Sequence, residues 1–234
     1  NEDDWIEEMK EPYRSKAWDL ISRESEHIDR FVTPSNYYKN LFITKTGIDA
    51  SKIDVVPIGF DGTIDLSSKI GNRPSAIGYF CRINRFNGFD KLVDAFIDLK
   101  KKNIIPDLVL NVCGGYTADD KSFILSQIQK VRNNGYAKFI KVFQEFQGPE
   151  MTEFFKSCDV ISVPVRKYDG YGLYILEANH AGIPVIQPAT GGFPEIISMT
   201  RGGLTYYPDT VEELSEALLK VLTDKSLRDE LGKN

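Results

Sequence analysis

A chain of 234 residues with 41% hydrophobic and 27% charged residues is long enough to bury a core, and its composition is that of a folded globular protein. No stretch approaches the roughly 18 consecutive apolar residues that a membrane-spanning helix needs. The net charge of −5 argues against sequence-independent binding of nucleic acid, because such binding requires a broad positive field. Any phosphate group that binds must therefore be met by local hydrogen-bond donors.

The N-terminus and the rare residues bear on localisation and on metals. Residues 1–9 are acidic and contain neither a basic nor an apolar segment, so they do not resemble a secretory signal, and the lack of an initiator Met favours a fragment. Cys81, Cys113 and Cys158 are far apart in apolar runs, which predicts buried thiols in a reducing compartment, and we expect the cytoplasm. Because the two histidines lack metal-ligand spacing, we expect no structural zinc site. We also predict no other metal and no cofactor.

The N-terminal part of the chain predicts a small α/β unit. Its pattern favours a helix over residues 13–27, a strand near Phe31, a helix over 35–45 and a strand over 53–56. This unit, residues 1–60, is too small to stand alone. Glycine and proline among polar residues then predict a linker over residues 61–74, so that a larger domain covers residues 75–234.

From residue 76 onward, short β-branched or aromatic runs alternate with helical stretches. The runs are continuously apolar, which fits a parallel sheet covered by helices on both faces. Apolar residues at helical spacing predict core helices over 89–99 and 211–222, the second capped by Thr210, and the run Lys100 to Lys102 indicates a solvated helix end. The predicted fold class is α/β, a doubly wound, Rossmann-like sheet of six parallel strands at residues 76–80, 108–113, 139–143, 160–165, 184–187 and 203–206.

The loops after the first and fourth of these strands carry the strongest candidates for ligand binding, because an open parallel sheet binds ligands outside the carboxyl ends of its strands. Arg82 follows the first strand, where a guanidinium would clamp a diphosphate through paired hydrogen bonds. Its position alone fits a solvated surface arginine equally well. Gly170 and Gly172 precede a helix over residues 173–181, so backbone N–H groups at the helix start would suit an anion such as pyrophosphate.

A carboxylate lies inside that helix. Glu177 is one turn from Leu173 and one turn from Ala181, so we expect it to share their inward face. The alternative, a rotated helix with a solvated Glu177, is the commoner case for a lone Glu. Another glycine-bearing loop, residues 190–195, follows the fifth strand and leads into a further helix.

Several competing motifs are absent from the sequence. There is no Gly-x-Gly-x-x-Gly after a strand, no Gly-x-x-x-x-Gly-Lys phosphate loop and no Gly-x-Ser-x-Gly elbow, which weakens dehydrogenase, NTPase and hydrolase interpretations. No Asp-x-Asp pair occurs to hold a divalent metal on a nucleotide sugar. Phosphate charge would therefore be met by Arg82 and main-chain amides.

Several segments follow the motifs of one known family in order. Residues 55–61 (VVPIGFD) resemble an interdomain V-I-P-N-G-V-D segment, and residues 32–35 (VTPS) resemble the strand and helix start before it. Residues 169–178 (DGYGLYILEA), 181–185 (AGIPV) and 191–195 (GGFPE) follow E-G-F-G-L, L-E-A, G-x-P-V and G-G-x-x-E. In these motifs the chain resembles the retaining GT-B glycosyltransferases of family 4, also called group 1.

The resemblance covers about residues 28–232 and implies roles for individual residues. The family has two Rossmann-like domains, so this chain would hold the C-terminal, nucleotide-sugar-binding half, with residues 1–60 as a remnant of the N-terminal acceptor domain. Glu177 would hydrogen-bond the nucleotide ribose, and Asp169, the first acid of the catalytic pair with Glu177, would contact hydroxyls of the donor sugar. The residues implied at the donor diphosphate are Arg82, Asn87, Gly170, Gly172 and Leu173.

Two departures from the family pattern fall at these positions. The family usually has Glu where this chain has Asp169, which is one methylene shorter, and usually has Lys where this chain has Asn87. The second change removes one of two positive charges expected on the diphosphate. Both changes would reduce donor affinity.

The resemblance implies a hexosyltransferase that moves a sugar, with retention, from a nucleoside diphosphate to an acceptor in polysaccharide or glycoconjugate biosynthesis. The acceptor site and any peripheral membrane contact would belong to the missing domain, so this chain alone would bind nucleotide and transfer little. Asp169 and Asn87 leave open a second interpretation, a catalytically weakened sugar-nucleotide-binding module. A third, an epimerase or phosphorylase of the same fold, fits the paired acids poorly. The base would contact mainly main chain near residues 142–145, which leaves its identity open.

Overall fold

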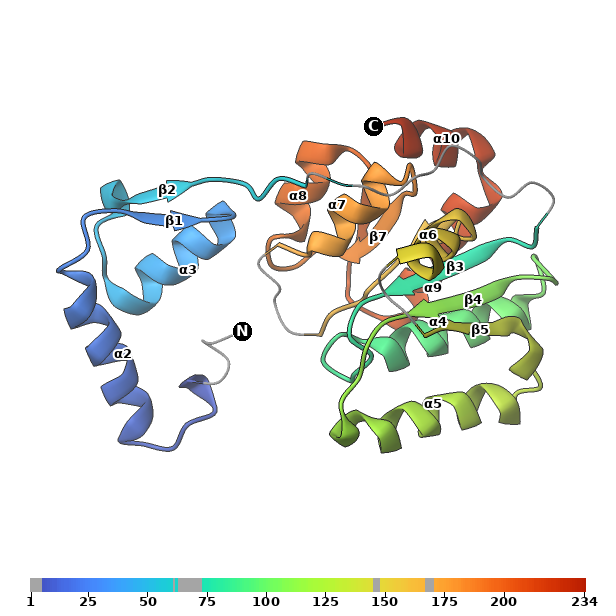
Figure 1. Cartoon of the computed structure of the whole chain (residues 1–234), viewed down its shortest axis with the longest axis horizontal. Coiled ribbons are helices and arrows are strands. Elements are labelled where there is room, and N and C mark those ends of the chain that lie inside the picture. The colour runs from blue at the N-terminus through green and yellow to red at the C-terminus, as the bar shows by residue number, and fades with distance from the viewer. Residues whose placement is uncertain (1–5, 61, 63–72, 145–147, 167–170) are drawn as a thin grey trace.

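The computed structural model describes residues 6–60, 62, 73–144, 148–166 and 171–234 (Figure 1). These residues contain a two-stranded sheet in the N-terminal unit and a six-stranded sheet in the larger domain. The predicted linker lies almost wholly outside the described residues. The elements of the N-terminal unit match the predicted ones closely and are α2 (Tyr13–Ser25), β1 (Phe31–Thr33), α3 (Asn36–Thr46) and β2 (Ile53–Val55).

Both ends of α3 are fixed by residues just outside it. The Ser35 hydroxyl oxygen accepts a hydrogen bond from the Tyr38 N–H at 3.2 Å, which caps the first turn. At the other end Gly47 adopts a φ of 71°, a left-handed conformation that glycine reaches without a Cβ clash. β1 and β2 pair in parallel beside this helix.

The six-stranded sheet has the order β5-β4-β3-β6-β7-β8, and every neighbouring pair of strands is parallel. The chain enters at β3, winds outward through β4 and β5, and then crosses β3 to wind outward through β6, β7 and β8. This is the doubly wound topology expected from the sequence, with its switch point at β3. The strands are β3 (Ala76–Phe80), β4 (Val109–Cys113), β5 (Ile140–Phe143), β6 (Val160–Ile161), β7 (Val185–Pro188) and β8 (Gly203–Tyr206).

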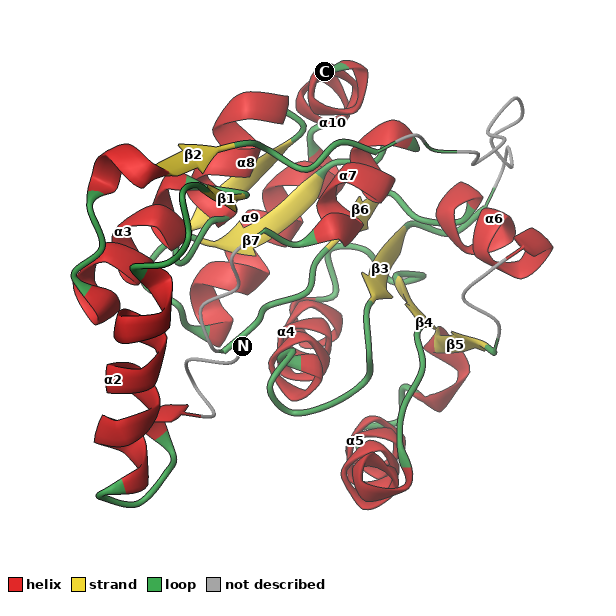
Figure 2. Ribbon diagram, turned by 60° about the vertical axis from the view of Figure 1, so that its left-hand side comes forward, coloured by secondary structure: helices red, strands yellow, loops and turns green. Residues whose placement is uncertain are grey.

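Helices cover both faces of this sheet (Figures 1 and 2). One face carries α4, α5 and α9, the other carries α6, α7 and α8, and α10 follows α9 and contacts it. Thr210 caps α9, as expected, by accepting from the Glu213 N–H. The helices are α4 (Phe89–Lys102), α5 (Lys121–Asn133), α6 (Gly148–Lys156), α7 (Leu173–His180), α8 (Phe193–Thr200), α9 (Val211–Thr223) and α10 (Lys225–Lys233).

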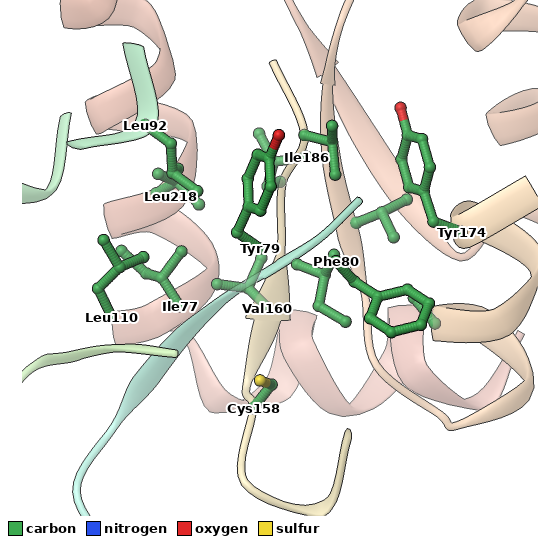
Figure 3. Close-up of a cluster of buried hydrophobic side chains, with 14 of the residues drawn as sticks. Ile77, Tyr79, Phe80, Leu92, Leu110, Cys158, Val160, Tyr174, Ile186 and Leu218 are labelled. Carbon is green, nitrogen blue, oxygen red and sulfur yellow. The ribbon is translucent and has the colours of Figure 1, made fainter. Parts of the chain in front are cut away.

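The core lies between the sheet and its two helical layers (Figure 3). Successive residues of a strand point to opposite faces. Accordingly, the Tyr79 ring packs against Phe89 of α4 with centroids 5.1 Å apart, whereas the Phe80 ring stacks on Phe154 of α6 at 5.5 Å. Both faces of β3 are covered, which explains why its residues form an unbroken apolar run.

A buried ion pair joins α4 to the turn before α9. Lys91 Nζ lies 2.6 Å from both carboxylate oxygens of Asp209, and the Lys91 side chain is only 7% exposed. The Tyr206 hydroxyl donates to Asp209 Oδ1 at 2.9 Å, and burial, followed by this carboxylate, raises the pKa of Tyr206. Loss of Asp209 would leave the buried Lys91 ammonium without a partner, so we expect this ion pair to hold α4 against the end of β8.

The predicted strand over residues 160–165 is wrong in length. β6 covers only Val160–Ile161, although residues 162–165 remain buried. Pro164 has no N–H to donate to a strand ladder, and the Ser162 hydroxyl donates to the Ile186 carbonyl at 2.7 Å. The apolar run therefore continues as a buried loop.

The prediction of a solvated Lys100 is also wrong. Lys100 is 5% exposed, donates to the Pro106 carbonyl at 2.5 Å and lies with its Nζ 3.3 Å from the centroid of the Phe139 ring. Burial disfavours its charge and lowers the pKa of the amine. Lys101 and Lys102 are exposed, as expected.

Candidate functional site

A pocket of about 350 Å³ lies at the carboxyl ends of β3 and β4. Because the two strands are parallel neighbours, the loops that follow them meet at the same edge of the sheet. Cys81 is partly exposed here, so the predicted burial of all three cysteines holds only for Cys113 and Cys158. The residues that line this β3–β4 pocket are Phe80, Cys81, Arg82, Cys113, Gly114, Gly115, Tyr116 and Thr117.

The backbone of Arg82 is held from two sides. Its carbonyl oxygen accepts a hydrogen bond from the Tyr79 hydroxyl at 2.9 Å and another from Asn87 Nδ2 at 2.9 Å. The Asn84 side chain accepts from the Asn87 N–H at 2.7 Å and so closes the loop. Asn87, predicted at the diphosphate, thus uses its amide nitrogen to fasten the loop that carries Arg82.

The side chain of Arg82 is held as well. Its Nε and Nη2 donate to Asp120 Oδ2 at 3.2 and 2.9 Å, and Nη2 also donates to Thr117 Oγ1 at 3.0 Å. The Thr117 N–H and the Arg82 guanidinium lower the pKa of the Asp120 carboxyl, which keeps it ionised at neutral pH. With 53% of its side chain exposed, Arg82 is a held cation at the rim of the β3–β4 pocket.

Two glycines allow the loops at this edge to approach one another. A Cβ on Gly114 would lie 1.8 Å from the Cys81 carbonyl oxygen, and a Cβ on Gly88 would lie 1.8 Å from the Pro164 carbonyl oxygen. The β3 loop is therefore in backbone contact with the β4 loop on one side and the β6 loop on the other. Only glycine fits at either contact without a shift of the main chain.

The predicted anion-binding helix start lies at this same edge. Gly172 adopts a φ of 72° and opens α7, whose first N–H groups, including that of Leu173, have no acceptor within the helix. The Arg166 N–H donates to the Phe86 carbonyl at 2.9 Å, which joins the loop before α7 to the Arg82 loop. The structure thus brings Arg82 and Gly172 to one end of the sheet. Asp169 and Gly170 lie outside the described residues.

Glu177 is half-buried, between the inward position and the solvated alternative that the sequence left open. The inward face predicted for Leu173, Glu177 and Ala181 is wrong for Leu173, which is 51% exposed, whereas Ala181 is buried. Burial raises the pKa of its carboxyl. No other described residue donates a hydrogen bond to it. A carboxylate that loses water without gaining a partner destabilises the fold, and such groups occur preferentially at functional sites.

The third glycine-bearing loop leads to a contact between the two units of the chain. Glu195, in the first turn of α8, accepts from the Asn36 N–H at 2.8 Å, the Asn36 side-chain amide at 3.0 Å and the Tyr37 N–H at 2.6 Å. A second contact runs from the Tyr171 hydroxyl to the Ile58 carbonyl at 2.6 Å. The N-terminal unit is therefore attached to the segments that precede α7 and begin α8.

Asp120 and Thr117 are the polar residues at this site that the sequence interpretation missed. Together they form a capping box at the turn after β4, in which each satisfies a backbone N–H of the other. Their sequence signal is Thr-x-x-Asp, which begins two residues after the last glycine of the β4 loop. Within the described residues no cluster of His, Cys, Asp or Glu could hold a metal ion, and no helix is long and apolar enough to cross a membrane.

Comparison with known proteins agrees with this architecture. A family model for glycosyl transferases group 1 matches residues 63–234. The D-inositol 3-phosphate glycosyltransferase of Paenarthrobacter aurescens is 28% identical over 200 residues, which cover 82% of this chain and 48% of that protein. The GDP-mannose-dependent alpha-(1-6)-phosphatidylinositol monomannoside mannosyltransferase of Mycobacterium tuberculosis is 23% identical over 227 residues, covering 89% and 56%. The chain thus spans about half the length of these curated relatives.

Solved structures share the fold. The C-terminal domain of the group 1 glycosyl transferase LpcC from Francisella tularensis superposes with a TM-score of 0.60 at 27% identity, covering 69% of this chain and 83% of that one. HepE of Anabaena, solved in complex with UDP, superposes with a TM-score of 0.79 at 18% identity, covering 97% and 62%. With the family model matching most of the sequence, these findings lead to one conclusion: the chain belongs to the group 1 glycosyl transferases.

Proposed function

We propose that this chain is the donor-binding part of a retaining hexosyltransferase that uses a nucleoside diphosphate sugar in polysaccharide or glycoconjugate biosynthesis in the cytoplasm. One observation carries the proposal. Arg82, after β3, and the first N–H groups of α7, which have no acceptor within the helix and follow β6, lie at the same edge of two adjacent parallel strands. This pairing of a cation with helix-terminal amides is suited to a diphosphate.

The proposed reaction breaks the bond between the anomeric carbon of the sugar and the diphosphate oxygen. The oxygen of an acceptor hydroxyl bonds to that carbon on the same face, and the proton of that hydroxyl passes to the departing diphosphate. Negative charge develops on the departing diphosphate, and Arg82 with the N–H groups of Gly172 and Leu173 stabilises it. The Glu177 carboxylate accepts hydrogen bonds from the ribose hydroxyls, which replaces the water that its burial removes. Asp169 contacts hydroxyls of the donor sugar, and no metal takes part.

Two kinds of similarity support a nucleotide sugar as the donor. The mannosyltransferase relative is named for its dependence on GDP-mannose, and HepE has been solved with UDP and with UDP-glucose. In our proposal the base contacts mainly main chain near residues 142–145. The acceptor site and any peripheral membrane contact belong to a part of the protein that this chain does not contain, so the chain alone binds the donor and transfers little.

The test is a calorimetric titration of the chain with UDP, GDP and ADP. Arg82→Ala should abolish or strongly weaken binding of whichever diphosphate binds, because it removes the cation at the β3–β4 pocket. Arg85→Ala is the matched control, since Arg85 is an exposed arginine of the same loop. Absence of binding to the unmodified chain at millimolar concentrations of all three nucleotides would end this proposal.

A second candidate is a catalytically weakened sugar-nucleotide-binding module. The observation that favours it is Asn87, which supplies no charge and whose amide nitrogen already donates to the Arg82 carbonyl. Asp169→Glu together with Asn87→Lys, made in the protein that also carries an acceptor domain, separates the two candidates. A large gain over a measurable basal rate of transfer supports a weakened enzyme, whereas no transfer in either form supports a binding module.

A further inference from the structure

We propose that Asp120 is a positioning residue for the donor diphosphate and acts by holding the Arg82 guanidinium in the orientation that receives it. The proposal rests on the donor-binding function proposed above and adds a residue outside the family motifs to it. Asp120 lies in the turn after β4, so the residue that aims the arginine comes from a different strand than the arginine itself.

The geometry shows one carboxylate oxygen serving as the hub of the loop. Asp120 Oδ2 accepts from Arg82 Nε at 3.2 Å and Nη2 at 2.9 Å, and from the Thr117 N–H at 3.0 Å and hydroxyl at 2.9 Å. The Asp120 side chain is 14% exposed, against 53% for Arg82. The carboxylate is thus fixed inside the turn, while the arginine that it holds projects from the edge.

Only one side of the guanidinium is engaged by these contacts. Nε and one hydrogen of Nη2 face the carboxylate, Nη2 also reaches Thr117, and no described residue accepts a hydrogen bond from Nη1. Arg82 and Thr117 both line the β3–β4 pocket. A guanidinium bound to a carboxylate through its Nε side keeps its remaining donors in a fixed plane for an incoming phosphate.

Loss of the Asp120 carboxylate changes diphosphate affinity through two opposing contributions. Removal of the Asp120 charge lessens its repulsion of a diphosphate, but the site is open to water, which screens that repulsion. Without its partner the exposed Arg82 side chain regains rotamer freedom that diphosphate binding must then remove. We therefore expect loss of the carboxylate to weaken diphosphate binding, opposite to what charge alone would give.

The decisive variant is Asp120→Asn, which keeps an acceptor oxygen for the Thr117 N–H but loses the charge that holds the arginine. UDP, GDP and ADP are titrated into the chain by calorimetry, and the tightest binder is used with each variant beside its parent nucleoside. We expect Asp120→Asn to weaken the diphosphate about five- to tenfold and to leave the nucleoside unchanged. Asp120→Ala should weaken it at least as much.

A double-mutant cycle with Arg82→Ala separates positioning from a general structural role. Asp120→Asn should have no further effect in the Arg82→Ala background, because there is then no arginine to hold. Unchanged or tighter diphosphate binding by Asp120→Asn, an equal loss for the nucleoside, or the same loss without Arg82 would each overturn the inference while leaving the proposed function intact. A chain that binds no diphosphate at all would overturn both.

Discussion

The contact between Glu195 and the start of α3 gives a sharp prediction about how the two units are attached. The N-terminal N–H groups of a helix lack acceptors within the helix. Ser35 accepts from the Tyr38 N–H within its own unit, and Glu195 accepts from the N–H groups of Asn36 and Tyr37, which lie 159 and 158 residues away in the sequence. Glu195→Ala removes both of its carboxylate oxygens, and Glu195→Gln leaves one.

The expected magnitude follows from the three hydrogen bonds lost. Bonds to a charged acceptor contribute about 1.5–3 kcal/mol each where fully buried, and removal of an N-cap side chain costs about 0.5–2 kcal/mol. Asn36 is exposed and Glu195 only partly buried, so we expect about 1–2 kcal/mol for Glu195→Ala and less for Glu195→Gln. An effect of this size changes a local opening equilibrium by about 5- to 30-fold.

Amide hydrogen exchange over residues 40–46 measures this opening. The amides in the later turns of α3 should exchange faster in Glu195→Ala by that factor, while those of β3 and β4 keep their rates. Glu216→Ala is the control, because Glu216 is an exposed glutamate of α9. Equal exchange of residues 40–46 in the Glu195→Ala and unmodified chains would refute the view that α8 caps α3.

Three further predictions concern two glycines with the same φ, the Glu177 carboxylate and the Lys91–Asp209 ion pair. Gly88 and Gly47 share a φ of 71°, but nothing lies within 4 Å of a Cβ built on Gly47, whereas a Cβ on Gly88 would lie 1.8 Å from a carbonyl oxygen. In urea unfolding, Gly47→Ala should therefore cost about 1–2 kcal/mol and Gly88→Ala clearly more. Equal costs would contradict the close approach at Gly88. Burial raises the folded-state pKa of Glu177, so its contribution to stability is present below the ordinary Glu pKa of about 4.3 and is lost as the pH rises through the raised value. Glu177→Gln should therefore raise the Tm at pH 7 and leave it unchanged below about pH 4. The same variant should weaken nucleotide binding. Asp209→Ala should destabilise the domain by about 3 kcal/mol, because it leaves the buried Lys91 ammonium without a partner. Lys91→Met should cost less, because Asp209 is 29% exposed and can be hydrated. The reverse order of these two costs in urea unfolding would contradict this account.

The sequence predicted what depends on local pattern. Five of the six strands of the larger sheet fall within one or two residues of their predicted bounds, because their apolar runs are bounded by polar or glycine positions. Thr210 was identified as a cap from its place before an apolar stripe. Arg82 and Gly172 could be expected at one edge because parallel strands end on the same side of a sheet. The local pattern did not distinguish strand from buried loop after Ile161.

Contacts between distant residues could not be predicted in the same way. Lys100 looks like the first of three solvated lysines, yet the Pro106 carbonyl and the Phe139 ring bury it. Asp120 lies 38 residues from the arginine that it holds, and Glu195 caps a helix in another unit. None of these pairings leaves a periodic signal in the sequence, because each depends on which loops the sheet order brings together.

The placement of β3 at the centre of the sheet has a consequence for how this protein can change over evolution. β4 and β5 flank it on one side and β6, β7 and β8 on the other, so the loops on the two sides of β3 come from two separate stretches of the chain. Under the proposed function, mutations in the loops after β4 and β5 change the nucleobase preference, while the loops after β6, β7 and β8 still bind the transferred sugar. The preference for the nucleobase and the preference for the sugar can then change separately, while β3 between the two sets of loops stays the same.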